Sequence, residues 1–312
     1  MSHVKQHYTN SGILALIFVS AGFGMMPVLA RYLGQGLGLF EQWYLRFAVA
    51  LIIALVIFRR KIDLRKFRSL ARHEWAVLIF RVLAGQIIGL GLFTLASEKA
   101  DAGIVSFMQV VPVIPLLGVL LVGERFTRNK ALITFVSFLG AAVVVVTNVH
   151  SLAPLNVGAL LSLASAVFYS AMLVTRKWHG DVLNNHEITV AFLALSGLAA
   201  YVISVVCDHR FMIPTSHLTW PFAAVVLAAG VLSVPVNFLI SYGFEHVSSI
   251  IAGNILTLEE VFGPLFGYVF YRQVLNGREI IGGSVILFSV ILMNFAIRRE
   301  DAAVTPPIGV AE

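Results

Sequence analysis

Two adjacent glutamates, Glu259 and Glu260, stand inside an apolar stretch of the sequence. A carboxylate among apolar side chains is costly unless it meets a cation, a proton or a hydrogen-bond donor. Glu260 continues a polar stripe with Asn254 and Thr257, at the i, i+3, i+6 spacing of one helix face. Neighbouring helical residues point about 100° apart, so Glu259 should face elsewhere and need a proton or a partner such as Arg46. The pattern predicts that Glu260 binds a cationic group, a proton, or both.

A matching stripe occurs 148 residues earlier, where Ser106, Gln109 and Pro112 show the same spacing, with Pro112 at the position of Glu260. Two further stripes are related by a shift of 147 residues: Gln86, Thr94 and Glu98, then Ser233, Asn237, Ser241 and Glu245. Such side chains either hydrogen-bond between helices or line a cavity that holds a polar ligand. We expect them to line one central cavity, with the following candidates for substrate binding: Glu260, Asn254, Thr257, Asn237, Ser241, Gln86, Gln109, Ser106 and Tyr169.

Arg46 and Arg81 are the basic residues that stand inside apolar segments. The side chain of Arg46 either reaches toward the end of its segment, pairs with a buried carboxylate, or binds a substrate carboxylate through its planar fork. Glu260, Glu259 and Arg46 are therefore candidates for proton coupling or for a structural ion pair. Arg81 is expected to reach toward the polar end of its segment.

The common catalytic motifs are missing from the sequence. It contains neither a Gly-x-Ser-x-Gly elbow nor a Walker A sequence. The nine histidines stand in polar segments without metal-ligand spacing. We therefore expect no catalytic residue, no cofactor, no metal site and no transport driven by ATP.

The composition requires a membrane. Of the 312 residues, 59% are hydrophobic and 12% are charged, whereas a soluble domain has about 25% charged residues; the mean hydropathy is +0.90. A helix needs about 20 residues to cross a bilayer core. Apolar runs of about this length occur at residues 12–31, 39–58, 75–96, 103–122, 130–149, 157–176, 188–206, 222–243, 250–271 and 279–297. The predicted fold class is an all-α polytopic membrane protein with ten transmembrane helices.

The distribution of basic residues predicts the orientation. With the N-terminus inside, the inner segments hold 15 Lys and Arg residues and the outer segments hold 5, and residues 59–72 alone hold seven. Because basic loops stay in the cytoplasm, both termini should be cytoplasmic, in a prokaryotic plasma (inner) membrane. The net charge of +6 then reflects these loops, so we predict no nucleic-acid partner.

The two halves of the chain resemble each other. Residues 12–32 match residues 158–178 with glycine, aromatic and basic positions in register, and Tyr169 stands where the first half has Phe23. That aromatic pair either stacks a flat ligand or packs as core. Since each half holds five helices, an odd number, the halves should be inverted five-helix repeats, as in many secondary transporters. The expected segments are a cytoplasmic N-terminal tail (1–11), a first repeat (12–149), a linker (150–156), a second repeat (157–297) and a cytoplasmic C-terminal tail (298–312).

The chain resembles the drug/metabolite transporter superfamily, specifically its EamA family. The segments that carry this resemblance are residues 41–55, 112–127 and 259–294. It implies two repeats, ten helices, both termini inside, and the four stripe-bearing helices at the centre. Two positions depart from the family pattern: Arg272-Gln273 replaces the Gly-Glu pair that Gly123-Glu124 forms in the first half, and Glu260 stands where proline is common.

These observations predict a secondary-active transporter, an exporter of amino acids or related small metabolites that works by alternating access around a central cavity. The alternative cargo is a nucleobase or a drug-like cation. The alternative of another class is a non-transporting membrane enzyme or scaffold. The expected partners are a small-molecule substrate, membrane lipid and protons, and the chain is expected to be a monomer or a homodimer.

Overall fold

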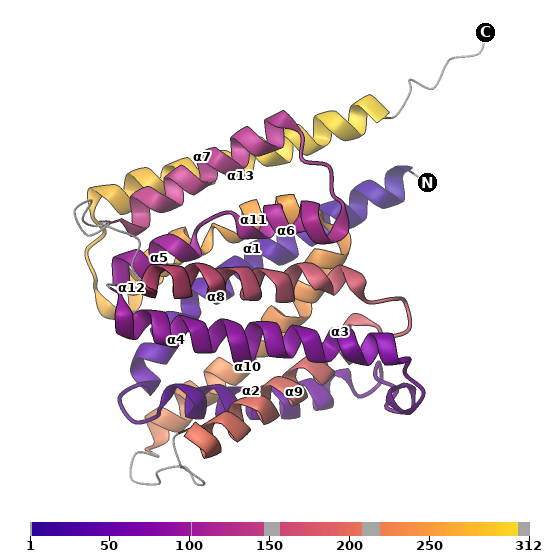
Figure 1. The fold of residues 1–312 in the computed structure, drawn as a ribbon, viewed down its shortest axis with the longest axis vertical. Coiled ribbons are helices and arrows are strands. Elements are labelled where there is room, and N and C mark those ends of the chain that lie inside the picture. The colour runs from indigo at the N-terminus through magenta and orange to yellow at the C-terminus, as the bar shows by residue number, and fades with distance from the viewer. Residues whose placement is uncertain (1, 101, 147–156, 208–218, 305–312) are drawn as a thin grey trace.

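A computed structural model describes residues 2–100, 102–146, 157–207 and 219–304. In these residues the chain is a bundle of helices that run roughly side by side (Figure 1). The helices are α1 (Ser2–Leu33), α2 (Leu39–Phe58), α3 (Arg72–Val82), α4 (Leu90–Lys99), α5 (Ala102–Gln109), α6 (Val113–Val122), α7 (Arg128–Val145), α8 (Val157–Val174), α9 (Asn185–Cys207), α10 (Trp220–His246), α11 (Ser249–Leu256), α12 (Glu259–Tyr271) and α13 (Gly277–Val304). A π-helical segment, Leu83–Gly89, joins α3 to α4, and a short 3₁₀ helix, Thr175–Trp178, extends α8.

Ten stretches of the described residues are long and apolar enough to cross a membrane. Their bounds are Asn10–Leu33, Leu39–Phe58, Arg72–Lys99, Ile104–Val122, Arg128–Val145, Val157–Trp178, Asn185–Val206, Trp220–His246, Ser249–Tyr271 and Gly277–Ala296. Each agrees with a predicted apolar run, so the predicted fold class is confirmed. The predicted end at 149, like the predicted linker, lies outside the described residues. The helices α1 and α13 continue beyond the apolar runs into the segments predicted as tails.

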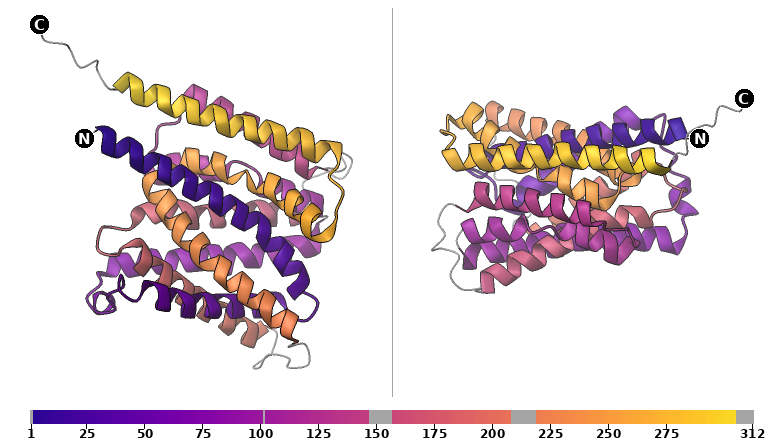
Figure 2. Two further views of the ribbon diagram at one scale, coloured as in Figure 1. Left: turned by 180° about the vertical axis from the view of Figure 1, so that it is seen from behind. Right: turned by 90° about the horizontal axis from the view of Figure 1, so that it is seen from above.

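The packing of the helices follows the internal repeat. The fifth and tenth spans, α7 and α13, lie against each other along one side of the bundle, and α2 and α9 lie together on the opposite side (Figures 1 and 2). The helix α1 packs against α10, and its repeat counterpart α8 packs in the same way against α4. Likewise α1 packs against α12, and α8 against α5 and α6. Exchanging the halves therefore preserves these principal helix contacts.

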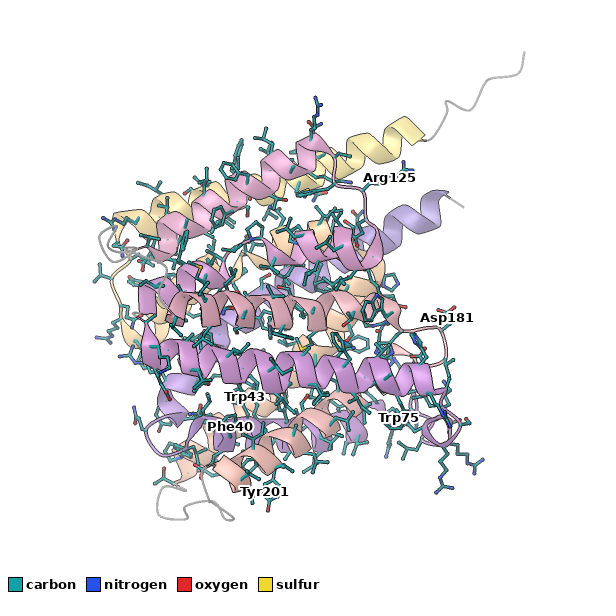
Figure 3. All side chains as sticks on the ribbon, viewed as in Figure 1. Phe40, Trp43, Trp75, Arg125, Asp181 and Tyr201 are labelled. Atoms are coloured by element: carbon teal, nitrogen blue, oxygen red, sulfur yellow. The ribbon has the colours of Figure 1, made fainter. Side chains whose placement is uncertain are left out.

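One end of the bundle carries most of the charged side chains. We call it the basic end; it is formed by residues 59–71, 123–127, 179–184 and 247–248. Trp75, Arg125 and Asp181 lie at this end in Figure 3, and the start of α1 and the end of α13 lie there too. Along the sides of the bundle the exposed residues are apolar, for example Leu120, as expected for a surface that meets lipid.

Two repeat-equivalent spans are interrupted near their middle. The first breaks between α5 and α6, where Pro112 has no N–H to donate and disfavours helical geometry at Val111. The second breaks between α11 and α12, where the Thr257 hydroxyl donates to the Asn254 carbonyl at 2.6 Å and so competes with the backbone ladder. Different residues thus produce a break at the same level of each half.

The same two spans also end in the same backbone conformation. Gly123 follows α6 with φ +73°, and Arg272 follows α12 with φ +53°. A left-handed residue after a helix is normally glycine, because a Cβ clashes there. The family departure at Arg272 is therefore also a strained position.

Replacing Arg272 with glycine should stabilise the protein by about 1 kcal/mol, because the side chain is exposed and its Cβ opposes the left-handed conformation. Thermal unfolding in detergent, followed by tryptophan fluorescence, measures the effect. Arg272→Ala is the matched control: it removes the same charge but keeps the Cβ, so its melting temperature should stay near that of the wild type. An equal rise in both variants would contradict the strain.

Candidate functional site

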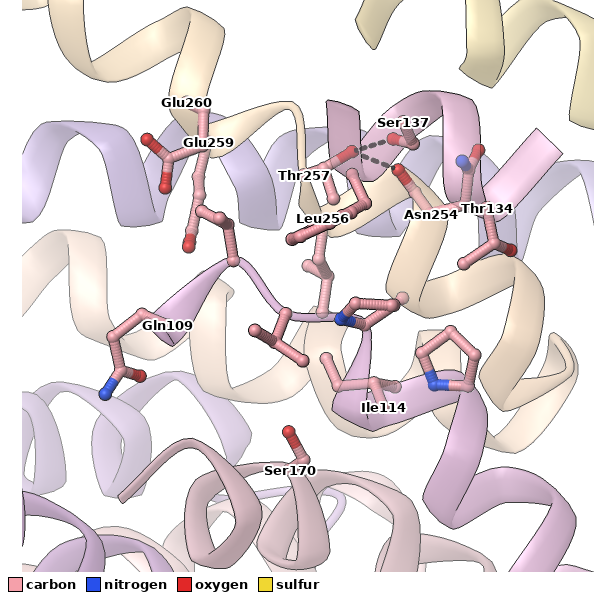
Figure 4. A pocket seen from close by; sticks show the side chains of 16 residues that line it. Gln109, Ile114, Thr134, Ser137, Ser170, Asn254, Leu256, Thr257, Glu259 and Glu260 are labelled. Atoms are coloured by element: carbon pink, nitrogen blue, oxygen red, sulfur yellow. Dashed lines mark hydrogen bonds between the residues drawn. The ribbon is translucent and has the colours of Figure 1, made fainter. Parts of the chain in front are cut away.

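The two helix breaks meet at one cavity, which we call cavity A (Figure 4). Its volume is about 70 Å³. Its walls come from the α5–α6 break, the α11–α12 break, α7 and one residue of α8. The polar lining residues are Gln109, Thr134, Ser137, Ser170, Asn254, Thr257, Glu259 and Glu260.

Both glutamates line cavity A, so the prediction that they face different surroundings is wrong. That prediction treated residues 250–271 as one continuous helix, but α11 ends at Leu256 and α12 begins at Glu259. Both carboxylates consequently lie in the first turn of α12, where the helix dipole favours negative charge. Neither has an ion-pair partner among the described residues.

A hydrogen-bonded chain connects α11 to α7 beside the glutamates (Figure 4). The hydroxyl groups of Thr257 and Ser137 lie 2.8 Å apart, and Thr257 also donates to the Asn254 carbonyl. Asn254 is almost fully buried, and its Oδ1 has no hydrogen-bond partner in the described part of the chain. A buried acceptor without a donor is costly, so this atom is suited to receive an N–H from a ligand. By contrast, Gln109 Nε2 donates to the Ser162 carbonyl at 3.0 Å, a bond between helices.

A second cavity, cavity B, lies between the first, second, third, sixth, seventh and eighth spans and has a volume of about 80 Å³. Four predicted site residues line it: Gln86, Tyr169, Asn237 and Ser241. The expected single central cavity is thus two cavities in this conformation, separated at the adjacent α8 residues Tyr169 and Ser170. The predicted residue Ser106 lines neither and is exposed.

Both intramembrane arginines line cavity B. Arg81 does not reach solvent at the end of its span: it is 3% exposed, and its Nε donates to the Met172 carbonyl at 3.1 Å. Arg46 donates to the Met26 sulfur at 3.2 Å and lies over the rings of Trp43 and Phe47. The ion pair considered for Arg46 and Glu259 does not form in this structure.

The aromatic pair predicted from the repeat does not form a flat stack. The rings of Phe23 and Tyr169 are tilted by 59° with centroids 6.5 Å apart. Both residues line cavity B, so they act as an apolar wall rather than a parallel platform.

Sequence reasoning missed Thr134 and Ser137 in α7 and misjudged Arg81. The first two stand at i and i+3 in an apolar helix, a spacing that could have identified them. The polar stripes predicted from the repeat belong to the third, fourth, eighth and ninth spans, whereas Thr134 and Ser137 belong to the fifth. The location of Arg81 could not be inferred from its distance to the span end.

The basic end is closed by contacts between glutamates and residues 176–179: two ion pairs, and a hydrogen bond to a histidine. Arg176 pairs with Glu245 at 3.1 Å, Lys177 pairs with Glu124 at 3.4 Å, and His179 lies 2.7 Å from Glu74. Glu245, which the stripe pattern singled out, is therefore part of this closure. Because these partners belong to α3, to the residues that follow α6, and to α10, the segment after α8 connects both halves of the bundle.

Glu124 also determines how the second broken span begins. Its carboxylate accepts the backbone N–H groups of Ser249 at 2.8 Å and Ile250 at 3.2 Å, the first turn of α11. A carboxylate at a helix N-terminus satisfies free donors and complements the dipole. The Gly-Glu pair of the first half thus has a direct structural purpose: it attaches the end of α6 to the start of α11.

The comparisons with known proteins agree with this architecture. A model of the EamA-like transporter family matches residues 10–146 and 156–295. The Pseudopaline exporter CntI of Pseudomonas aeruginosa is 26% identical over 286 residues, covering 91% of this chain and 96% of that protein. An uncharacterized transporter of Methanothermobacter thermautotrophicus is 23% identical over 229 residues, covering 71% of this chain and 65% of that protein. One solved crystal structure superposes with a TM-score of 0.75 at 16% identity, covering 94% of this chain and 99% of its own, and supports the fold alone.

The closure at the basic end should make stability depend on pH. Burial, reinforced by the positive charge of Arg81, lowers the pKa of His179 to about 4, against the hydrogen bond with Glu74. The folded protein keeps this imidazole neutral, whereas an unfolded histidine takes up a proton near pH 6.5. Unfolding therefore binds a proton between these values, so His179 reduces stability as the pH falls from about 6.5 toward 4.

His179→Gln should accordingly weaken the pH dependence of stability between pH 7 and 5, lowering proton uptake on unfolding by up to about one per molecule. Melting temperatures at a series of pH values in detergent measure it. A wild-type slope in His179→Gln would contradict the prediction.

Proposed function

The chain belongs to the EamA-like transporter family, and from this membership we propose that it is a secondary-active exporter of amino acids or related small metabolites. The family identifies an integral membrane transporter rather than an enzyme, in contact with a small-molecule substrate and lipid. Export as the direction of transport is supported by the relative that is named a pseudopaline exporter. The second candidate cargo, a nucleobase or drug-like cation, is supported by the unpaired carboxylates of cavity A.

We propose alternating access between the two repeats, residues 12–149 and 157–297. The observation that carries this proposal is the pair of repeat-equivalent broken spans, whose breaks both line cavity A. Discontinuous helices at the interface of two repeats are where many transporters hold their substrate. Because ligand cavities are usually about 300–1,000 Å³, cavities of about 70 and 80 Å³ must widen before cargo enters.

The ion pairs at the basic end support a conformation that is closed on that side. We propose that this side faces the cytoplasm of a prokaryotic cell, because the basic loops gather there. Opening it requires separating the end of α8 from α3, α6 and α10, and therefore breaking the pairs of Arg176, Lys177 and His179. We propose that the protein acts as a monomer or a homodimer.

Glu260 is proposed to bind a cationic group of the cargo, a proton, or both in turn. Burial disfavours the charged form of a carboxylate, and the neighbouring Glu259 adds like-charge repulsion. A carboxyl pair in such surroundings can exchange a proton for a cation when the cavity opens. This exchange is how a proton gradient would drive export.

Glu260→Gln should reduce transport at least about tenfold and flatten its pH dependence, because the amide neither binds a proton nor carries charge. The measurement is uptake and counterflow of labelled phenylalanine by protein in liposomes at pH 6 to 8. Glu98→Gln is the matched control: Glu98 is exposed at the end of α4, away from both cavities, so its rates should equal those of the wild type. Unchanged rates and an unchanged pH profile in Glu260→Gln would refute the role of Glu260.

A further inference from the structure

Cavity B holds two cations that lack an anion among the described residues, the buried Arg81 and the partly buried Arg46. Arg81 Nη1 and Arg46 Nε have no hydrogen-bond partner in the described part of the chain, and neither guanidinium pairs with a carboxylate there. Arg81 is 3% exposed. Leaving a buried charge unpaired is among the most destabilising arrangements in proteins. At the basic end glutamates pair with Arg176 and Lys177, but at cavity B no described carboxylate pairs with either arginine.

The surroundings of the two guanidinium groups leave their edges available. Arg46 lies 4.9 Å and 5.2 Å from the ring centroids of Phe47 and Trp43, and Arg81 lies 5.5 Å from that of Phe192. Aromatic rings attract the face of a guanidinium, whereas its N–H groups lie in the plane. This is the arrangement in which arginine receives a planar carboxylate side-on.

The present acceptors of these N–H groups are weak or shared. Arg46 donates to the sulfur of Met26, and Arg81 donates to the carbonyl of Met172, which also accepts a longer bond from Thr175. A thioether is a poor acceptor for a cation. A carboxylate entering cavity B would therefore replace weak contacts by charge-assisted ones.

Tyr169 stands near the charged groups of both cavities. This tyrosine lines cavity B and is within electrostatic range of both Arg46 and Glu259, while the next residue, Ser170, lines cavity A. Adjacent residues of α8 thus line the two cavities, one of which holds the cations and the other the carboxylates.

We propose that cavity B is the subsite for the carboxylate of the cargo, held by Arg46 and Arg81, while the amino group of the same molecule binds Glu259 and Glu260 in cavity A. The cargo class is an amino-carboxylate zwitterion with an apolar side chain, which the aromatic walls of cavity B accept. This inference rests on the proposed export function and specifies its substrate. It requires Tyr169 to move so that the two cavities join.

The test uses liposome counterflow of labelled phenylalanine, with two unlabelled competitors that each lack one charge. Phenylalanine amide keeps the amino group, and 3-phenylpropionate keeps the carboxylate. In the wild type, unlabelled phenylalanine should inhibit counterflow at a concentration about tenfold or more below that of either competitor. Each competitor lacks one charge-assisted contact, and one such contact contributes about tenfold or more in affinity.

Arg46→Gln and Arg81→Gln should each raise the half-saturating phenylalanine concentration by about tenfold or more and leave inhibition by the amide unchanged. The selectivity ratio between acid and amide separates lost recognition from poor folding, because a misfolded variant loses both. Arg81→Lys keeps the charge without the fork and should lie between the wild type and Arg81→Gln. The control is Arg31→Gln, another arginine beside an aromatic ring, at 4.5 Å from the Tyr271 centroid and outside both cavities.

Two outcomes separate this inference from the proposed function. Phenylalanine counterflow with an unchanged acid-to-amide ratio in both glutamine variants overturns the carboxylate subsite and leaves export standing. Absence of counterflow, together with a melting-temperature rise caused by 3-phenylpropionate in the wild type but not in Arg81→Gln, overturns the export of amino acids and supports the anion subsite.

Discussion

The structure depends on one constraint: a polar group inside an apolar bundle must find a partner there. Where the chain provides partners, the bundle is closed. At the basic end Arg176, Lys177 and His179 each meet a glutamate, and these pairs join α8 to three other helices. At the two cavities Arg46 Nε, Arg81 Nη1 and Asn254 Oδ1 lack a partner among the described residues, and these are groups with the chemistry to bind a small ligand. Single atoms of Arg176 and His179 also lack a hydrogen-bond partner at the basic end, but there each side chain meets a glutamate through another atom.

The two broken spans show how a symmetric scaffold acquires asymmetric chemistry. In the first half the break arises from Pro112, a residue with no side-chain charge and no N–H. In the second half Glu260 stands at this position, and the break arises instead from local hydrogen bonding at Thr257. The backbone keeps the repeat while the side chains differ, so the carboxylates enter the cavity without loss of the break. The proposed alternating access requires the halves to exchange conformations, and the shared break in the backbone is consistent with that proposal.

Much of this architecture could be predicted from the sequence because a bilayer imposes simple rules. Helix length, apolar composition and the matched spacing of Gln86 with Ser233 or Ser106 with Asn254 are visible directly in the chain. The breaks inside two spans were not predicted, and from this error followed the wrong separation of Glu259 from Glu260, because angular arguments hold only along a continuous helix. The position of Arg81 was missed for another reason: whether a long cation reaches the span end or stays inside depends on contacts from α8 and α9, which no local pattern contains.

The charges of the two cavities are divided between the repeats, and this division has a mechanical consequence. Arg46 and Arg81 belong to the first half, whereas Glu259 and Glu260 belong to the second. The two glutamates have uncharged counterparts in the first half, Val111 and Pro112. A zwitterion that contacts both pairs must therefore bridge the halves. It makes both contacts only when the distance between the arginines and the glutamates matches the distance between its own two charges. A cargo with a single charge can bind one half in every conformation and favours none. Because a ligand shifts an equilibrium only by its differential affinity for the two states, the zwitterion is the cargo whose own charges couple binding to the movement of the repeats.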